Sequence, residues 1–313
     1  MTRERLSALV PWFALAAAIL VVGSFDSTFL RPATLIGLSA DSATLFLMAL
    51  GMTWVLYLGS IDLSLQSVAA VSSVVLAQLI PGYGFLAIIA ALAAGLAFGL
   101  LSGYVHGVLK LPSFIATLAV GGIATTTALA LSNQKSIQID ALPRSHTLGW
   151  AIGVTFGIPN EIWVSLVALA AAFVVEQMTP FGKAMKAVGC SEPAARVAGI
   201  RIKQSKLIVF MCAGLFAALS GIVLAGRLSS GSPTIANEFL LPAIAAAVLG
   251  GTSLTGGSGS VIRTLVGTLL IVVARTGMTF VGINALAQQI VFGVVLIVAV
   301  SLSAGRIIQG TSK

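Results

Sequence analysis

Few residues in this chain combine into a pattern that could do chemistry. Two histidines and nine carboxylates are spread over 313 residues, and no Ser/His/Asp arrangement or set of metal ligands can be recognised among them. The two cysteines, Cys190 and Cys212, have no CxxC motif and no neighbouring histidine, which argues against a disulfide or a metal site. We therefore predict no catalytic residue, no metal site and no cofactor bound by this chain.

Polar residues within or beside apolar runs are better candidates for function. A carboxylate at the centre of a membrane costs roughly 2.5–3.5 kcal/mol on insertion scales, so it is usually functional or paired. Asp41 lies inside an apolar run, whereas Asp62 stands at the junction of two runs, where it could instead cap the next helix. As residues that line or gate a solute pathway we predict Asp41, Asp62, Ser64, Asn284 and Gln288.

The elements that position these residues are expected to be membrane-spanning helices. The chain is 58% hydrophobic and only 8% charged, whereas about 25% of the residues in a soluble domain are charged. Its apolar runs continue for about twenty residues, the length with which a helix crosses the hydrocarbon layer. The first run is interpreted as a retained anchor, because further runs follow it and no signal-peptide cleavage site closes it. We predict an all-α, polytopic membrane protein with a single transmembrane domain over 1–313 and about ten spans, at 6–25, 33–58, 62–80, 84–109, 111–132, 161–178, 207–226, 239–256, 260–281 and 285–303.

The basic residues predict how these spans are oriented. With the N-terminus in the cytoplasm, twelve of the 17 Lys and Arg residues fall in cytoplasmic segments and four in outer ones, as the positive-inside rule requires. Both termini are therefore expected in the cytoplasm, with the long loop 133–160 outside and the long loop 179–206 inside. The basic residues behind the net charge of +8 lie mostly in loops between the predicted spans. We therefore expect the chain to be surrounded by a lipid bilayer, and we do not expect nucleic acid as a partner.

Two glycine patterns carry structural information. Gly95, Gly99, Gly103 and Gly107 recur every four residues on one helix face, which favours a close helix contact within the chain or, alternatively, between two copies. The glycine-rich stretch 250–259 lacks the lysine of a phosphate-binding loop, so we predict that the chain hydrolyses no nucleotide. This stretch is expected to be a turn, either at the cytoplasmic face or re-entrant. The overlapping stretch 249–258 also aligns with 58–67, which indicates a weak internal repeat of the kind found in transporters.

The loop 179–206 contains a predicted short helix. Ser191 can cap this helix, Glu192 and Pro193 suit its first turn, and Gly199 can end it. A short helix held outside the membrane between two spans could dock onto a cytoplasmic partner. The alternative is a solvated loop that is positively charged because it lies inside.

Four segments, taken in order, carry a resemblance to a known family. They are Ala49 to Thr53 leading to Gly59 to Ser64, then Leu111 to Leu118 (LPSFIATL), Thr179 to Ile200, and Ala243 to Gly259 with VLGGTSL at 248–254. Together they resemble the permease subunits of bacterial ABC importers for ribose and other monosaccharides, a branch that also includes autoinducer-2 permeases. Ser60 and Gln66 stand where many relatives have glycine, and Pro193 is unusual in its segment.

The resemblance implies a subunit of an ATP-driven importer in the bacterial inner membrane. It implies a permease homodimer or a heterodimer with a paralogue, a cytoplasmic ATPase that binds ATP and Mg²⁺, and a periplasmic sugar-binding protein. The residues expected to couple the permease to the ATPase are Lys186, Gly189, Glu192, Ala194, Ala195, Arg196, Gly199 and Ile200. The expected function is import of a monosaccharide or related polyol. The alternatives are a secondary carrier and a membrane enzyme or scaffold, and the sequence shows neither the intramembrane ion relay nor the catalytic cluster that these would need.

Overall fold

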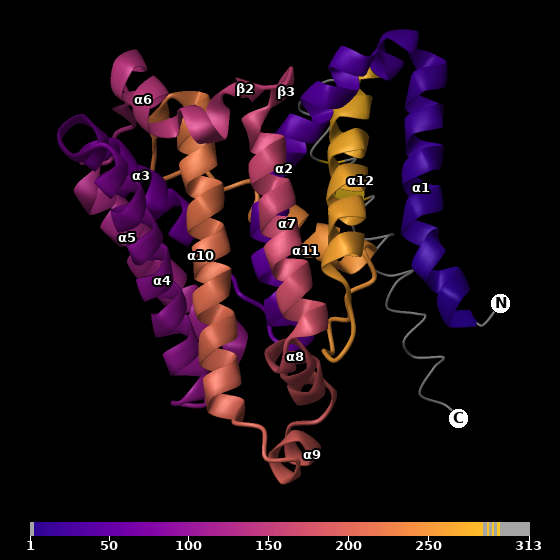
Figure 1. Ribbon diagram of the computed structural model, residues 1–313, viewed down its shortest axis with the longest axis vertical. Helices are drawn as coiled ribbons and strands as arrows, with labels where there is room; N and C mark the ends of the chain where they lie inside the picture. The colour runs from indigo at the N-terminus through magenta and orange to yellow at the C-terminus, as the bar shows by residue number, and fades with distance from the viewer. Residues whose placement is uncertain (1–2, 284–286, 288–289, 291–292, 295–313) are drawn as a thin grey trace.

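The computed structural model describes residues 3–283, 287, 290, 293 and 294, and nearly all of this part is helical (Figure 1). The elements in chain order are α1 (Arg3–Phe25), η1 (Ser27–Leu30), α2 (Pro32–Tyr57), α3 (Leu65–Tyr83), α4 (Phe85–Gly107), α5 (Ser113–Leu131), β1 (Ile137–Gln138), α6 (Ala141–Ile152), β2 (Val154–Thr155), β3 (Ile158–Pro159), α7 (Asn160–Met178), α8 (Pro180–Cys190), α9 (Glu192–Val197), α10 (Ile202–Leu228), β4 (Ser230–Gly231), α11 (Leu240–Leu249) and α12 (Val261–Phe280). The short strands form antiparallel pairs, β1 with β4 and β2 with β3.

Within the described residues, seven helices are long and apolar enough to cross a membrane, namely α2, α3, α4, α5, α7, α10 and α12. Two shorter apolar helices are Leu9–Phe25, within α1, and α11. The prediction of an all-helical, polytopic membrane protein is therefore confirmed at this level. The predicted span 285–303 lies outside the described residues.

The prediction of a full span over 239–256 is wrong. α11 ends at Leu249, and its ten residues extend only about 15 Å at 1.5 Å per residue, half of a 30 Å hydrocarbon layer. The chain then turns through Gly251, Gly256 and Gly257, whose positive φ angles suit glycine. The residues after Leu249 are mostly glycine, serine and threonine, and their backbone forms the turn expected over 250–259.

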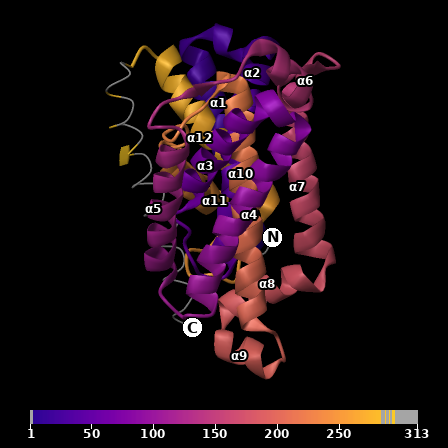
Figure 2. The same cartoon turned by 90° about the vertical axis from the view of Figure 1, so that its left-hand side faces the viewer.

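α10 lies in the centre of the bundle and packs against α2, α3 and α4 (Figures 1 and 2). All four glycines of the predicted stripe face it: a Cβ on Gly95 would lie 2.6 Å from the Gly214 carbonyl oxygen, and one on Gly103 would lie 3.0 Å from the Leu207 Cα. Side chains at these positions would push the two backbones apart. The prediction of a close helix contact within the chain is therefore confirmed.

The two long loops of the sequence lie at opposite ends of the bundle. α6 and the β2–β3 pair occupy one end, whereas α8 and α9 project from the other (Figure 2). The predicted short helix is confirmed as α9, because the Ser191 hydroxyl accepts a hydrogen bond from the Ala194 backbone N–H at 3.3 Å. Gly199, with φ of 80°, lets the chain leave this helix and enter α10.

The two stretches aligned as an internal repeat lie against each other near α8. Each directly follows a helix end, that of α2 or that of α11. A Cβ on Gly59 would lie 2.9 Å from the Thr255 carbonyl oxygen, and one on Gly256 would lie 2.7 Å from the Gly59 nitrogen. The contact brings the α2–α3 loop (58–64) and the α11–α12 loop (250–260) into one layer. That the two stretches are copies of an internal repeat stays a prediction.

Candidate coupling surface and transport pathway

α9 forms an exposed tip at the end of the molecule. Val197 is 91% exposed, and Ala194, Arg196 and Gly199 are also exposed. Ala195 is the exception, because it is only 3% exposed and packs inward. One residue thus anchors the short helix, and its neighbours remain available to a partner.

The Glu192 side chain pairs with a residue of this same chain, unlike the exposed side chains of the α9 tip. Its carboxylate lies 2.5 Å from the Lys206 ammonium group near the start of α10. The ion pair therefore connects α9 directly to α10 across the short link 198–201. We therefore assign Glu192 to holding α9 in place.

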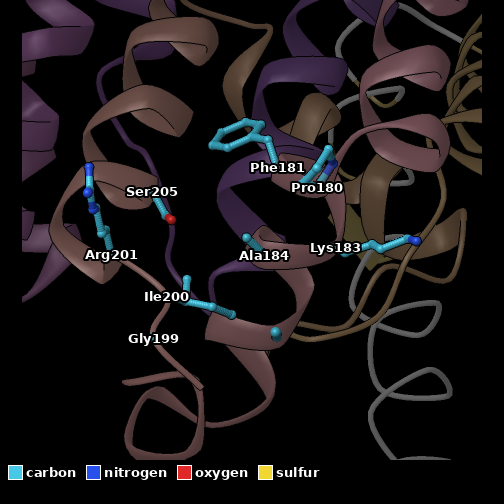
Figure 3. Close-up of a pocket in the computed structure, with 9 residues that line it drawn as sticks. Pro180, Phe181, Lys183, Ala184, Gly199, Ile200, Arg201 and Ser205 are labelled. Atoms are coloured by element: carbon cyan, nitrogen blue, oxygen red, sulfur yellow. The ribbon is translucent and has the colours of Figure 1, made fainter. Parts of the chain in front are cut away.

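A groove runs between α8 and the start of α10, beside α9 (Figure 3). It encloses about 540 Å³, and apolar atoms of Phe181, Ala184 and Ile200 line its inner surface. Lys183 and Arg201 extend away from it on opposite sides (Figure 3). The groove can therefore accept an apolar side chain of a partner, with positive charge at its edges.

Two of the predicted coupling residues, Lys186 and Gly189, are turned towards the membrane helices. The Lys186 ammonium group lies 2.6 Å from the carboxylate of Glu176 in the last turn of α7. The Gly189 Cα packs on the Tyr57 carbonyl oxygen, and a Cβ there would also lie 2.6 Å from the Gly257 nitrogen. These residues connect α8 to the rest of the permease.

Asp62 is fully buried in the α2–α3 loop, outside both helices. One of its oxygens accepts hydrogen bonds from the Ser64 backbone N–H at 2.8 Å and from the Ser64 hydroxyl at 2.6 Å. Its other oxygen has no hydrogen-bond partner in the described structure. Burial raises the pKa of this carboxyl to about 6, and the hydrogen bonds from Ser64 oppose the rise. In this arrangement Asp62 holds the turn from which α3 starts.

The same loop is fixed to α4 and α5 by three further hydrogen bonds. The Ile61 backbone N–H donates to the Ser113 hydroxyl at 3.2 Å, and the Leu63 backbone N–H donates to the Thr117 hydroxyl at 2.9 Å. The Ser60 hydroxyl lies 3.2 Å from Nε2 of His106. Side chains of α5 thus accept from two backbone N–H groups of a segment that has no regular structure, while His106 of α4 contacts the Ser60 side chain.

Asp41 belongs to an ionic cluster near the opposite end of the bundle. It pairs with Arg227 in the last turn of α10, and the Arg227 Nε lies 3.6 Å from a carboxylate oxygen of Glu161 at the start of α7. The Asp41 side chain is 52% exposed and that of Glu161 only 10%. Asp41 is therefore the most exposed member of this cluster.

A second ion pair lies beside a non-helical segment. Residues 232–239, between β4 and α11, are not helical, and the Ser232 backbone N–H donates to the Ser73 hydroxyl of α3 at 3.3 Å. Glu238 in this segment pairs at 2.6 Å with Arg275 of α12, and both side chains are about half exposed. Arg275 is about 21 Å along α12 from Val261 at 1.5 Å per residue, so this pair lies well within the span.

Non-helical backbone at membrane depth is found where it is buried in protein or lines a water-filled cavity. Discontinuous helices with such segments form substrate sites in many transporters. Segment 232–239, with its ion pair and the exposed polar residues Thr234 and Asn237, fits that description. The predicted pathway residues Asn284 and Gln288 lie outside the described residues.

Comparison with known proteins gives one matching family over most of the chain. Residues 34–300 match the model of the permease component of the branched-chain amino acid transport system. The chain is 33% identical over 290 residues to the ribose import permease protein RbsC of Escherichia coli K12, covering 92% of this chain and 90% of that protein. It is 34% identical to RbsC of Bacillus subtilis over 94% of this chain and 92% of that protein.

Another relative is the L-arabinose transport system permease protein AraH of Escherichia coli K12, 34% identical over 81% of this chain and 77% of that protein. No solved structure matches the chain. The family match includes the spans, the non-helical segment 232–239 and both loops at the α8 end. The chain therefore belongs to the family of branched-chain amino acid and sugar ABC importer permeases, and is a multi-pass membrane subunit that transports rather than catalyses.

Proposed function

We propose that this chain is the membrane-spanning permease of an ATP-driven importer for a monosaccharide or related polyol in the bacterial inner membrane. The observation that carries the proposal is the similarity to ribose and arabinose permeases over nearly the whole chain. A homodimer, or a heterodimer with a paralogue, would work with a cytoplasmic ATPase that holds ATP and Mg²⁺. A periplasmic binding protein would deliver the sugar.

The coupling surface is α9 together with the groove between α8 and α10. Val197 at the end of the molecule is 91% exposed and, together with the apolar lining of the groove, supports docking of a partner there. The exposed predicted residues Ala194, Arg196 and Gly199 lie beside it, and Ile200 lines the groove. Lys186, Gly189, Glu192 and Ala195 act from within, because they hold α8 and α9 against the permease.

The pathway is proposed to include Asp41 and the Glu238–Arg275 pair. Ionisable residues within a membrane span rarely face lipid. They usually face the interior of the bundle or a water-filled cavity, where they mark solute pathways. A carboxylate accepts and a guanidinium donates hydrogen bonds, so a pair of them matches a sugar hydroxyl, which does both. Asn284 and Gln288 remain proposed pathway residues. Asp62 and Ser64 are proposed to hold the α2–α3 loop, which closes the pathway at the α8 end of the bundle.

The orientation follows from the same proposal. An ATPase docks from the cytoplasm, which puts α8 and α9 inside and α6 with the β2–β3 pair outside. The six basic residues of the loop 179–206 support this orientation through the positive-inside rule. The loop 133–160 is then periplasmic and both termini are cytoplasmic.

The test is affinity purification of the tagged chain from its native host in a mild detergent, with mass spectrometry of the proteins that accompany it. We expect an ATPase subunit to co-purify with the wild-type chain. Val197→Asp should lose this subunit, because it places a carboxylate at the docking tip. The matched control is Phe156→Asp, since Phe156 is 92% exposed in the β2–β3 turn at the opposite end. A wild-type chain that purifies without an ATPase after gentle crosslinking would favour a secondary carrier instead.

A further inference from the structure

Glu176 is a buried carboxylate at which three helices meet. It lies in the last turn of α7, and its side chain is 0% exposed. One oxygen accepts from the Lys186 ammonium group of α8 at 2.6 Å. The other accepts from the Val261 backbone N–H, the first of α12, at 3.0 Å. The carboxylate thus ties the end of α7 to α8 and to the start of α12.

Lys186 extends this connection to two further segments. Its ammonium group also donates to the Gly259 carbonyl oxygen at 3.2 Å, and it lies 4.9 Å from the centre of the Tyr57 ring at the end of α2. The Gly257 backbone N–H in turn donates to the Tyr57 carbonyl oxygen at 3.0 Å. α8 is therefore fixed to the α11–α12 loop and to α2 as well as to α7. Figure 1 shows α8 directly below α7 and beside that loop.

The arrangement is better suited to fixing geometry than to stabilising the fold. Removing two charges from water costs about as much as their attraction returns, so a buried ion pair is weak evidence for stability. A carboxylate at a helix N-terminus, by contrast, fixes the position of that terminus through a backbone N–H and the helix dipole. Glu176 holds the α12 terminus in this way while its partner Lys186 belongs to α8. A displacement of α8 must therefore move the start of α12 or break a buried contact.

We propose that Glu176 is a positioning residue that transmits movement of α8 and α9 to α12 through Lys186. The inference rests on the proposed function, in which an ATPase moves α8 and α9. α12 carries Arg275, the partner of Glu238 beside the non-helical segment. The Glu176–Lys186 pair thereby connects the surface that receives the ATPase to the helix that lines the pathway.

The test uses the complete transporter, with its ATPase and binding protein, reconstituted in proteoliposomes. Glu176→Gln keeps the size and a hydrogen-bond acceptor for α12 but removes the charge that holds Lys186. Lys186→Met removes the α8 side of the link, together with the hydrogen bond to Gly259, and leaves the contact between Glu176 and Val261 in place. We expect both variants to assemble and to hydrolyse ATP, while the sugar imported per ATP falls by roughly fivefold or more. A residue that only stabilises the fold would lower hydrolysis and import in proportion and leave their ratio unchanged.

The matched control is Asp26→Asn. Asp26 also accepts a backbone N–H at a helix start, from Thr28 at 2.8 Å, but it belongs to the connection between α1 and α2, which lies at the end opposite α8 (Figure 1). This variant should keep the wild-type ratio. If Glu176→Gln fails to assemble, the ratio of sugar imported to ATP hydrolysed by Lys186→Met tests the proposal instead. A wild-type ratio in the assembled variants overturns this inference alone, whereas wild-type uptake that needs no ATP overturns the proposed function.

Discussion

Replacing Gly99 by alanine tests whether the α4–α10 contact depends on the absence of side chains. A Cβ at this position would meet the Phe210 carbonyl oxygen and lie 3.1 Å from the Met211 Cα. Both neighbours are backbone atoms of α10, so no side chain can rotate away. The two helices must therefore separate, or the variant must bear the overlap.

The size of the effect follows from two opposing terms. Overpacking a closely packed site costs about 1–3 kcal/mol, whereas alanine gains about 1 kcal/mol over glycine within a helix. Gly122 in α5 supplies the control, because nothing lies within 4 Å of a Cβ added there. The propensity term is common to both variants, so the difference between Gly99→Ala and Gly122→Ala isolates the overpacking cost.

The assay is the apparent melting temperature of each purified variant in the same detergent. We expect Gly122→Ala to melt at or slightly above the wild-type temperature and Gly99→Ala on the order of 5 °C lower than Gly122→Ala. Gly107→Ala should fall between them, because its nearest neighbour is the Lys206 Cβ at 3.1 Å. Equal melting temperatures for Gly99→Ala and Gly122→Ala would refute the packing argument.

Three further outcomes are expected. Asp41→Ala leaves Arg227 with its 3.6 Å contact to Glu161 and its hydrogen bond to the Ala40 carbonyl oxygen, and uptake should fall by roughly tenfold with normal membrane insertion. Wild-type uptake by a correctly inserted variant would remove Asp41 from the pathway. Glu238→Gln should raise the sugar concentration needed for half-maximal uptake, and an unchanged value would count against this site. The pKa of Asp62, raised from 3.8 to about 6, makes its burial most favourable below pH 3.8 and less so as pH rises through 6. The melting temperature should therefore fall more steeply between about pH 4 and pH 6 in the wild type than in Asp62→Asn, and equal slopes would contradict this.

Local patterns in the sequence predicted a large part of the fold. The stripe from Gly95 to Gly107 has the spacing of one helix face, and small residues on such a face require a close neighbour. Ser191 and Gly199 likewise mark the ends of α9 through interactions of a few residues' range. Such features depend on the chain near each position, so a single sequence is enough to find them.

α11 was mispredicted because hydropathy measures composition and not backbone conformation. The run from Leu240 continues with small residues beyond Leu249, but the glycines there adopt positive φ. The turn expected over 250–259 is observed, but only the structure shows that segment 232–239 precedes a half-length helix. The helix α6 within the loop 133–160 was likewise not anticipated, since its sequence is only weakly apolar.

The site residues were harder to predict because their partners are distant in sequence. Asp41 pairs with Arg227, 186 positions away, and no local pattern connects them. Lys186 was expected to face the ATPase, yet it lies against Glu176 and Gly259. Glu176 itself could have been noticed as a carboxylate in the last turn of a span, which is a position that usually requires a partner.

The central claim is ATP-driven import, and uptake of radiolabelled ribose or arabinose into proteoliposomes tests it most directly. The vesicles would hold this chain with its co-purified ATPase, with ATP inside and the binding protein outside. The account predicts uptake that requires ATP, the ATPase and the binding protein, and that an uncoupler does not abolish. Uptake by this chain alone, without ATP and abolished by an uncoupler, would contradict it.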